Sequence, residues 1–144
     1  VLTASSPPEV VMMQFPACIG QDVVRASEML WQACPPSLPE GCKMFVLEGD
    51  PKAADLFTVR FKSAEGFSMP AHTHPKDERV TILAGTVRVG FGMDAKKETA
   101  TVFGPGDYYV NKRGEVHKVW AEGGSILQIT GIGPWEANFV ASKD

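Results

Sequence analysis

The residues of this chain whose types and spacing could bind a metal ion are its three histidines and one glutamate. His72 and His74 are separated by one residue, Glu78 follows four residues later, and His117 lies in a second segment. Divalent transition metals take imidazole nitrogen and carboxylate oxygen at about 2.0–2.2 Å. Alternate residues of a β-strand point to the same face, so His72 and His74 can reach one ion. These residues therefore predict a site for one divalent transition-metal ion.

The alternative interpretation is that these histidines have a structural role and bind no metal. A single histidine, or an isolated pair of histidines one residue apart, is more often a surface feature or a satisfied core residue than a ligand. Here Glu78 resumes a strand-like run in which Val80 and Ile82 share its face. Both segments also contain glycines and β-branched residues, which favours a site built on strands.

The first segment, residues 66–85, resembles the first motif of the cupin superfamily. Gly66, the pair His72 and His74, Glu78 and Gly85 meet every spacing of that motif. The motif is highly specific. The resemblance implies that the two histidines and the glutamate are metal ligands.

The second segment, residues 106–121, resembles the second cupin motif with two departures. Gly106, Gly114 and His117 occupy their expected places. Lys112 stands where the family usually has proline, and Ala121 stands where it usually has asparagine. The departures affect a turn and an outer position, and the ligand position is kept. The resemblance covers residues 57–140 and implies a double-stranded β-helix, the jelly-roll barrel of cupins.

The distribution of strand-forming residues also predicts an all-β fold. Short apolar or alternating runs recur with glycine or proline between them, which favours a sandwich or barrel. Besides the strands of the first motif, we predict strands at residues 9–15, 29–33, 43–48, 56–62, 86–91, 100–103, 107–111, 116–120, 125–132 and 135–140. Residues 94–99 read as a hairpin end or one helical turn. We expect less than about a fifth of the chain to be helical.

The length and charge of the chain limit its organisation and partners. At 144 residues it is predicted to be one domain, residues 1–144, with a loose tail at residues 1–8. The net charge of −3 and the lack of a basic stripe disfavour a nucleic-acid partner. No apolar run approaches 18 residues, so no membrane span is expected. The apolar stretch at residues 9–15 would expose a sticky edge, and cupin barrels commonly pair, so we predict a homodimer.

The three cysteines leave two redox states open. Cys34 and Cys42 bracket a turn rich in proline and glycine, and in an oxidising compartment they could form a disulfide that leaves Cys18 free. The alternative is three reduced thiols. The chain begins at Val1, which fits a processed or trimmed product, and the sequence leaves open whether a signal peptide preceded Val1. Both an exported, periplasmic location and a cytoplasmic one stay open.

The predicted ligand set suits a catalytic ion. Three histidines and one glutamate leave two positions open on an octahedral ion, whereas structural sites are closed. The set does not distinguish iron, manganese, nickel, zinc and copper. Apolar residues expected to line a pocket beside the ion are Val80, Ile82, Val89 and Val119. Arg60 and Gln128 lie within apolar strands and are predicted either to face that pocket or to lie on the barrel surface.

The cupin resemblance implies dioxygenases, isomerases and decarboxylases, but also sugar-binding and non-catalytic members. We therefore predict a metalloenzyme that acts on a small organic molecule, with dioxygenase-like oxidoreductase chemistry favoured over isomerisation. The alternative is a non-catalytic domain that binds or senses a small molecule and uses the metal as a docking point. Residues 47–51 and 128–135 also resemble small single-domain bacterial cupins, which brings no particular reaction.

Overall fold

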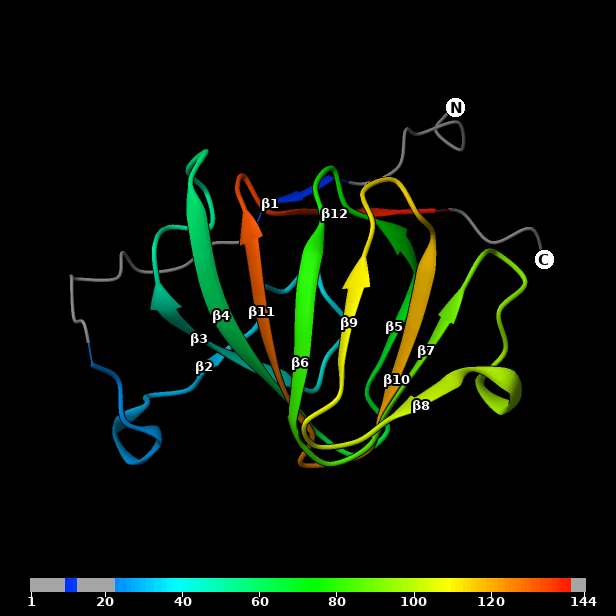
Figure 1. Ribbon diagram of the computed structural model, residues 1–144, viewed down its shortest axis with the longest axis horizontal. Coiled ribbons are helices and arrows are strands. Elements are labelled where there is room, and N and C mark those ends of the chain that lie inside the picture. The colour runs from blue at the N-terminus through cyan, green and yellow to red at the C-terminus, as the bar shows by residue number, and fades with distance from the viewer. Residues whose placement is uncertain (1–9, 13–22, 141–144) are drawn as a thin grey trace.

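The computed structural model describes residues 10–12 and 23–140, which form two six-stranded sheets (Figure 1). The strands are β1 (Val10–Met12), β2 (Gln32–Ala33), β3 (Cys42–Glu48), β4 (Leu56–Ser63), β5 (Ser68–Thr73), β6 (Glu78–Ala84), β7 (Val87–Phe91), β8 (Thr101–Phe103), β9 (Tyr108–Asn111), β10 (His117–Ala121), β11 (Ile126–Ile132) and β12 (Glu136–Phe139). One sheet has the order β1-β12-β5-β10-β7-β8 and the other β2-β3-β4-β11-β6-β9. All strand pairs among the described residues are antiparallel. The predicted all-β jelly-roll fold is confirmed.

The alternating sequence patterns place apolar side chains between the two sheets. On β4, Phe57 and Val59 are buried, and on β6 Val80 and Ile82 are buried on the same face as Glu78. Adjacent strands continue this face because β11 pairs with both β4 and β6. Val87, Val89 and Val119 of the other sheet are buried as well, so the core lies between the two sheets.

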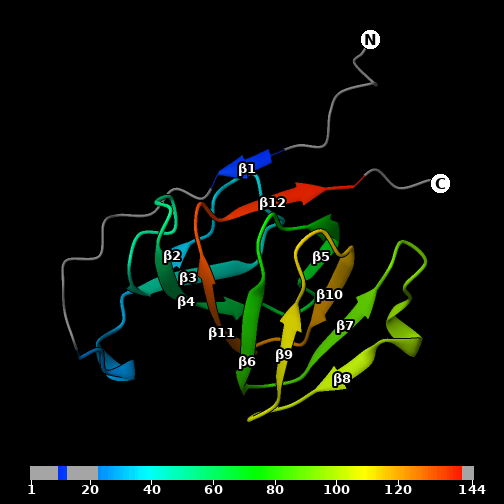
Figure 2. The same ribbon diagram turned by 45° about the horizontal axis from the view of Figure 1, so that its top comes forward.

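The strands of both sheets converge at the lower end of Figure 1, and β1 and β12 lie across the other end. Figure 2 shows the same pair from above, side by side. β12 also pairs with β5, where Asn138 lies opposite Thr73. The end of β5 and the start of β6 therefore lie near β12.

Helical structure among the described residues is limited to two short 3-10 turns, Ala26–Glu28 and Lys97–Thr99. The second falls within the charged segment predicted to be a hairpin end or a helical turn. The predicted strand at residues 29–33 was too long. Only Gln32 and Ala33 pair with a neighbour, opposite Met44 and Lys43 of β3.

Two further expectations lie partly outside the described residues. Of the predicted first strand at residues 9–15, the structure describes the central β1. The other positions, like the predicted tail at residues 1–8, lie outside the described part. Phe91 ends β7 and is 41% exposed, before Gly92 turns with a positive φ of 95°.

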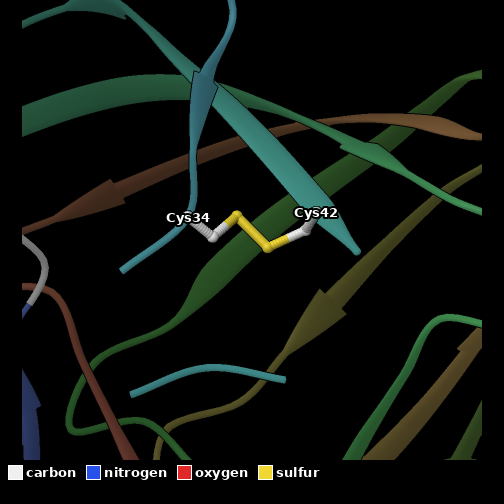
Figure 3. Close-up of a disulfide and its surroundings, with 2 residues drawn as sticks. All are labelled: Cys34 and Cys42. Carbon is white, nitrogen blue, oxygen red and sulfur yellow. A yellow bond between two sulfur atoms is a disulfide. The ribbon is translucent and has the colours of Figure 1, made fainter. Parts of the chain in front are cut away.

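Cys34 and Cys42 form a disulfide that joins the chain after β2 to the start of β3 (Figure 3). Their Cα atoms are 5.6 Å apart, within the range that such a bond requires. Of the two states left open by the sequence, the structure therefore has the cross-linked one. Cys18 lies outside the described residues. No described helix has the length and apolar character needed to span a bilayer.

Candidate metal centre

Two neighbouring strands bring the three histidines together inside the barrel. His72 lies on β5, His74 follows the end of that strand, and His117 begins β10, directly opposite His72 in the ladder. All three are at most 5% exposed. One nitrogen from each ring lies within 4.8 Å of those of the other two. Residues far apart in the sequence thus form one compact group of imidazoles.

Backbone carbonyls orient all three rings. In each ring Nδ1 lies near a carbonyl oxygen: Pro70 at 2.7 Å for His72, Glu136 at 2.7 Å for His74, and Glu115 at 3.3 Å for His117. A carbonyl can only accept, so we assign the proton to Nδ1 in each case. Nε2 is then the atom left for another partner. Metal-binding histidines are commonly held in this way.

Glu78, the first residue of β6, lies beside this group and is held by two N–H donors. Its Oε1 accepts a hydrogen bond from Asn111 Nδ2 at 2.9 Å, and its Oε2 accepts one from Trp135 Nε1 at 2.7 Å. Oε1 also lies 3.1 Å from His74 Nε2. Two ligands bound at right angles at about 2.1 Å would lie about 3.0 Å apart. The atoms that lie within 4.8 Å of one another belong to the three histidines and do not include Glu78, which contacts the group through His74.

Asn111 and Trp135 were not identified as site residues from the sequence. Asn111 ends the apolar strand β9, where a buried polar side chain needs a partner, and this was the available signal. Trp135 gave no such signal, because its contact with Glu78 joins residues 57 positions apart in the sequence.

The pKa values within the group differ because the surroundings differ. Burial, followed by the nearby His117 and His74, lowers the pKa of His72 to about 3, and burial also lowers that of His117. Burial works to lower the pKa of His74 as well. The charge and hydrogen bond of Glu78 outweigh it, so this pKa is raised. Burial would raise the pKa of Glu78, but His74 reverses that effect and the pKa is lowered. Of the three histidines, His74 is therefore the one that takes up a second proton at the highest pH.

The histidine group opens into a cavity of about 60 Å³ inside the barrel, with mostly apolar walls. The apolar lining includes Phe61, Phe67, Met69, Leu127 and Ile129. Tyr109 also lines the cavity, and its ring stacks on Phe103 with centroids 4.6 Å apart. Burial, and after it the charge of Glu78, raises the pKa of Tyr109 far above its usual range, so its hydroxyl keeps its proton.

The structure divides the six residues predicted for the pocket. Val80 and Val119 line the cavity beside the histidines. Ile82 and Val89 are fully buried in the core and do not belong to the cavity lining. Arg60 and Gln128 also lie away from it. They sit opposite each other on β4 and β11, and Arg60 Nε donates to Gln128 Oε1 at 3.0 Å. On β4, alternation puts Arg60 on the face opposite Val59.

An antiparallel jelly-roll barrel with buried histidines from these two motifs defines the chain as a cupin. Residues 20–136 match the family described as the ChrR cupin-like domain, and the chain belongs to that family. Among curated proteins none matches significantly.

Solved structures share the fold at low sequence identity. The polyketide cyclase RemF from Streptomyces resistomycificus is 19% identical with a TM-score of 0.67, over 87% of this chain and 89% of that one. An acetylacetone dioxygenase from Acinetobacter johnsonii is 18% identical with a TM-score of 0.66, over 89% and 83%. An RmlC-like cupin from Shewanella frigidimarina NCIMB 400 is 17% identical with a TM-score of 0.62, over 78% and 91%. These likenesses establish the fold alone.

Proposed function

We propose that this cupin binds one divalent transition-metal ion and acts on a small organic molecule in the adjoining cavity. His72, His74 and His117 would supply Nε2 ligands, and Glu78 would supply a carboxylate oxygen. The observation that carries the proposal is the set of three buried imidazoles, each with Nδ1 directed at a carbonyl and with ring nitrogens within 4.8 Å. Burying imidazole nitrogens that lack a partner costs free energy, which a shared ion would offset.

The donor set fits a catalytic ion of the iron or manganese type, while nickel, zinc and copper stay chemically allowed. When bound, such an ion would supply two open positions and, for iron or manganese, redox chemistry with dioxygen. The chain's own contribution is to orient the ligands, exclude water and hold an apolar molecule. We favour oxygenase-like chemistry, and the acetylacetone dioxygenase and polyketide cyclase that share the fold both act on small organic molecules.

We also propose that the chain forms a homodimer. β1 is the outermost strand of its sheet and pairs only with β12 among the described residues, which leaves one edge for another chain. Sedimentation analysis at tens of micromolar should give the mass of a dimer. A monomer at that concentration would remove the proposal.

The first test of the metal site is elemental analysis of protein purified without a nickel column. We expect close to one equivalent of a transition metal per chain. Glu78→Gln keeps the shape of the side chain but removes its charge, so it should weaken binding or change which metal is preferred. If Glu78→Gln binds the same metal with wild-type affinity, Glu78 is not a ligand.

The second test separates catalysis from binding. Dioxygen uptake by the iron-loaded protein is measured with and without candidate small organic substrates. Uptake that depends on a substrate supports the oxygenase proposal. Binding of the same compounds without turnover, for each metal tried, would favour the non-catalytic alternative.

A further inference from the structure

One buried polar atom beside the candidate metal centre has no use in the proposed metal site. Asn111 is 2% exposed, its side chain lines the cavity, and its Nδ2 donates to Glu78 Oε1. Only the NH₂ group can donate to a carboxylate, so this bond fixes the orientation of the amide. Asn111 Oδ1 is then left without a hydrogen-bond partner among the described residues. A buried acceptor in this state destabilises the fold unless something else donates to it.

The walls around this atom indicate what could donate to it. They are mainly apolar, with Leu127 and Ile129 among them. Tyr109 is a polar member of the lining that hydrogen-bonds with the Asn111 amide, but Oδ1 is left without a partner among the described residues. Lys62 belongs to the lining, but its ammonium group lies 5.6 Å from the ring centroid of Trp31 in a cation–π contact. Apart from Lys62 and the histidine group, the described lining contains no basic side chain. An anionic group at Asn111 would lie next to the Glu78 carboxylate and, outside the histidine group, would find no cation to pair with, so burying its charge there would be costly.

We infer that this part of the cavity is a hydrogen-bonding subsite for a hydroxyl or N–H group on a small, uncharged and largely apolar molecule. Asn111 Oδ1 is the acceptor, and the apolar walls hold the body of the ligand. The inference rests on the proposed function in one respect, since the ligand would be the small organic molecule that the metal acts on. Because Asn111 also holds Glu78, the recognised group would lie next to the candidate metal ligands.

Such a subsite distinguishes ligands that carry a hydrogen-bond donor from ligands that do not. A site built around a buried acceptor rejects an analogue of the same shape that lacks the donor, because the acceptor then stays unsatisfied. The asparagine amide does not titrate, so this selectivity should not change with pH through Asn111 itself. The atom would recognise the donor in the same way in the metal-free and metal-loaded protein.

The test uses two probes of nearly equal shape, phenol and fluorobenzene, of which only phenol can donate. Their affinities are measured by chemical-shift titration in NMR with the full chain in its metal-free form. We expect phenol to bind at least about tenfold more tightly to the wild type, from the usual penalty for an unsatisfied buried acceptor. The side-chain amide signals of Asn111 should shift with phenol and remain in place with fluorobenzene.

Two variants assign the selectivity to the correct atom. Asn111→Leu keeps the approximate size but removes the acceptor, so the two affinities should become equal within about twofold. Arg60→Ala is the control, since Arg60 bonds to Gln128 away from the cavity and the change leaves Asn111 in place. It should retain the preference for phenol. If Asn111→Leu does not fold, the Asn111 amide signals of the wild type decide.

The outcomes separate this inference from the proposed function. Equal affinities in the wild type, or an unchanged preference in Asn111→Leu, would overturn the subsite. The first result is also the one expected if a tightly held water already donates to Asn111 Oδ1. A preference for phenol in a protein that takes up no metal would uphold the subsite and contradict the metal centre. Metal uptake by a protein that shows no preference for phenol would support the metal centre and contradict the subsite.

Discussion

The two ends of the barrel interior differ in how completely their buried polar side chains are hydrogen-bonded. At one end, Glu78 lies opposite Asn111 and Gly131 in the ladder, next to the histidines. At the other end of the same sheet, Cys42 lies opposite Ser63. We refer to these as the histidine end and the serine end. One cavity reaches both, since its lining includes Glu78 and Cys42.

The serine end satisfies its polar groups within the chain. The hydroxyls of Ser63 and Ser125 both donate to the carbonyl oxygen of Glu122, at 3.0 and 2.6 Å. Ser125 Oγ also accepts from the backbone N–H of Thr86 at 3.2 Å. Gly85 has a positive φ of 80°, and a Cβ there would overlap Ser125, so this turn requires glycine.

At the histidine end, the polar groups are incompletely paired within the described part of the chain. Its three rings use Nδ1 for backbone carbonyls, and His74 Nε2 lies 3.1 Å from Glu78 Oε1. Among the described residues, Asn111 Oδ1 is an acceptor without a partner. Buried groups that are oriented but incompletely paired mark sites where a ligand binds. The serine end is thus satisfied within the chain, and we place the proposed function at the histidine end.

The largest effect should come from removing a histidine. His74→Ala and His117→Ala each delete one inner ligand, so metal affinity should fall by more than about tenfold. Metal content per chain measures this, with circular dichroism as the control for folding. The barrel should remain folded, because its core consists of residues such as Val59, Ile82 and Phe57. Equal metal content in wild type and both variants would refute the site.

The pH dependence of metal binding should reveal the single protonated histidine. A proton on His74, whose pKa is raised, must leave before its Nε2 can bind an ion. The pKa of His72 is lowered to about 3 and that of His117 is also lowered, so neither competes near neutral pH. Affinity should therefore fall about tenfold per pH unit below the pKa of His74, and the fall should begin above about pH 6.5.

Competitive metal titration over about pH 5 to 8 gives the number of protons released per ion. One proton is expected. A release approaching three would mean that all three rings are protonated in the metal-free protein. That result would contradict the lowered pKa values of His72 and His117.

The disulfide should affect stability without affecting the metal. Replacing Cys34 and Cys42 together by serine opens a loop whose ends are 8 residues apart. The free energy of unfolding should fall by roughly 2–3 kcal/mol by the chain-entropy estimate. Denaturant unfolding of oxidised wild type and the double variant measures the change. Metal content should be unaltered, and a loss of metal would show that the two ends of the cavity are coupled.

The smallest effect is expected outside the barrel. Arg60→Ala removes the hydrogen bond to Gln128 on the outer face of β4 and β11. The free energy of unfolding should change by at most about 1 kcal/mol, and neither metal content nor the affinity for phenol should change. A tenfold loss of either affinity would mean that Arg60 reaches the cavity after all.

Local patterns in the sequence determined the fold class and the gathering of the histidines. Alternation set the inward faces of β4 and β6, because a side-chain period of two leaves only one choice of buried face. The spacing of His72, His74 and Glu78 put three polar groups near one point, since each lies on a strand or next to one. Short strands, glycine turns and these spacings are local properties, so they could be predicted from the sequence alone.

Only the tertiary structure decided which groups hold the histidines and Glu78, and where the pocket residues lie. Asn111 and Trp135 reach Glu78 from β9 and from the entry to β12, 33 and 57 positions away along the chain. The sequence likewise left Arg60 and Gln128 between the pocket and the outer surface, because a polar residue in a strand gives no sign of which sheet face is covered. Contacts across such distances depend on strand order and register, which the whole barrel sets and no single segment encodes.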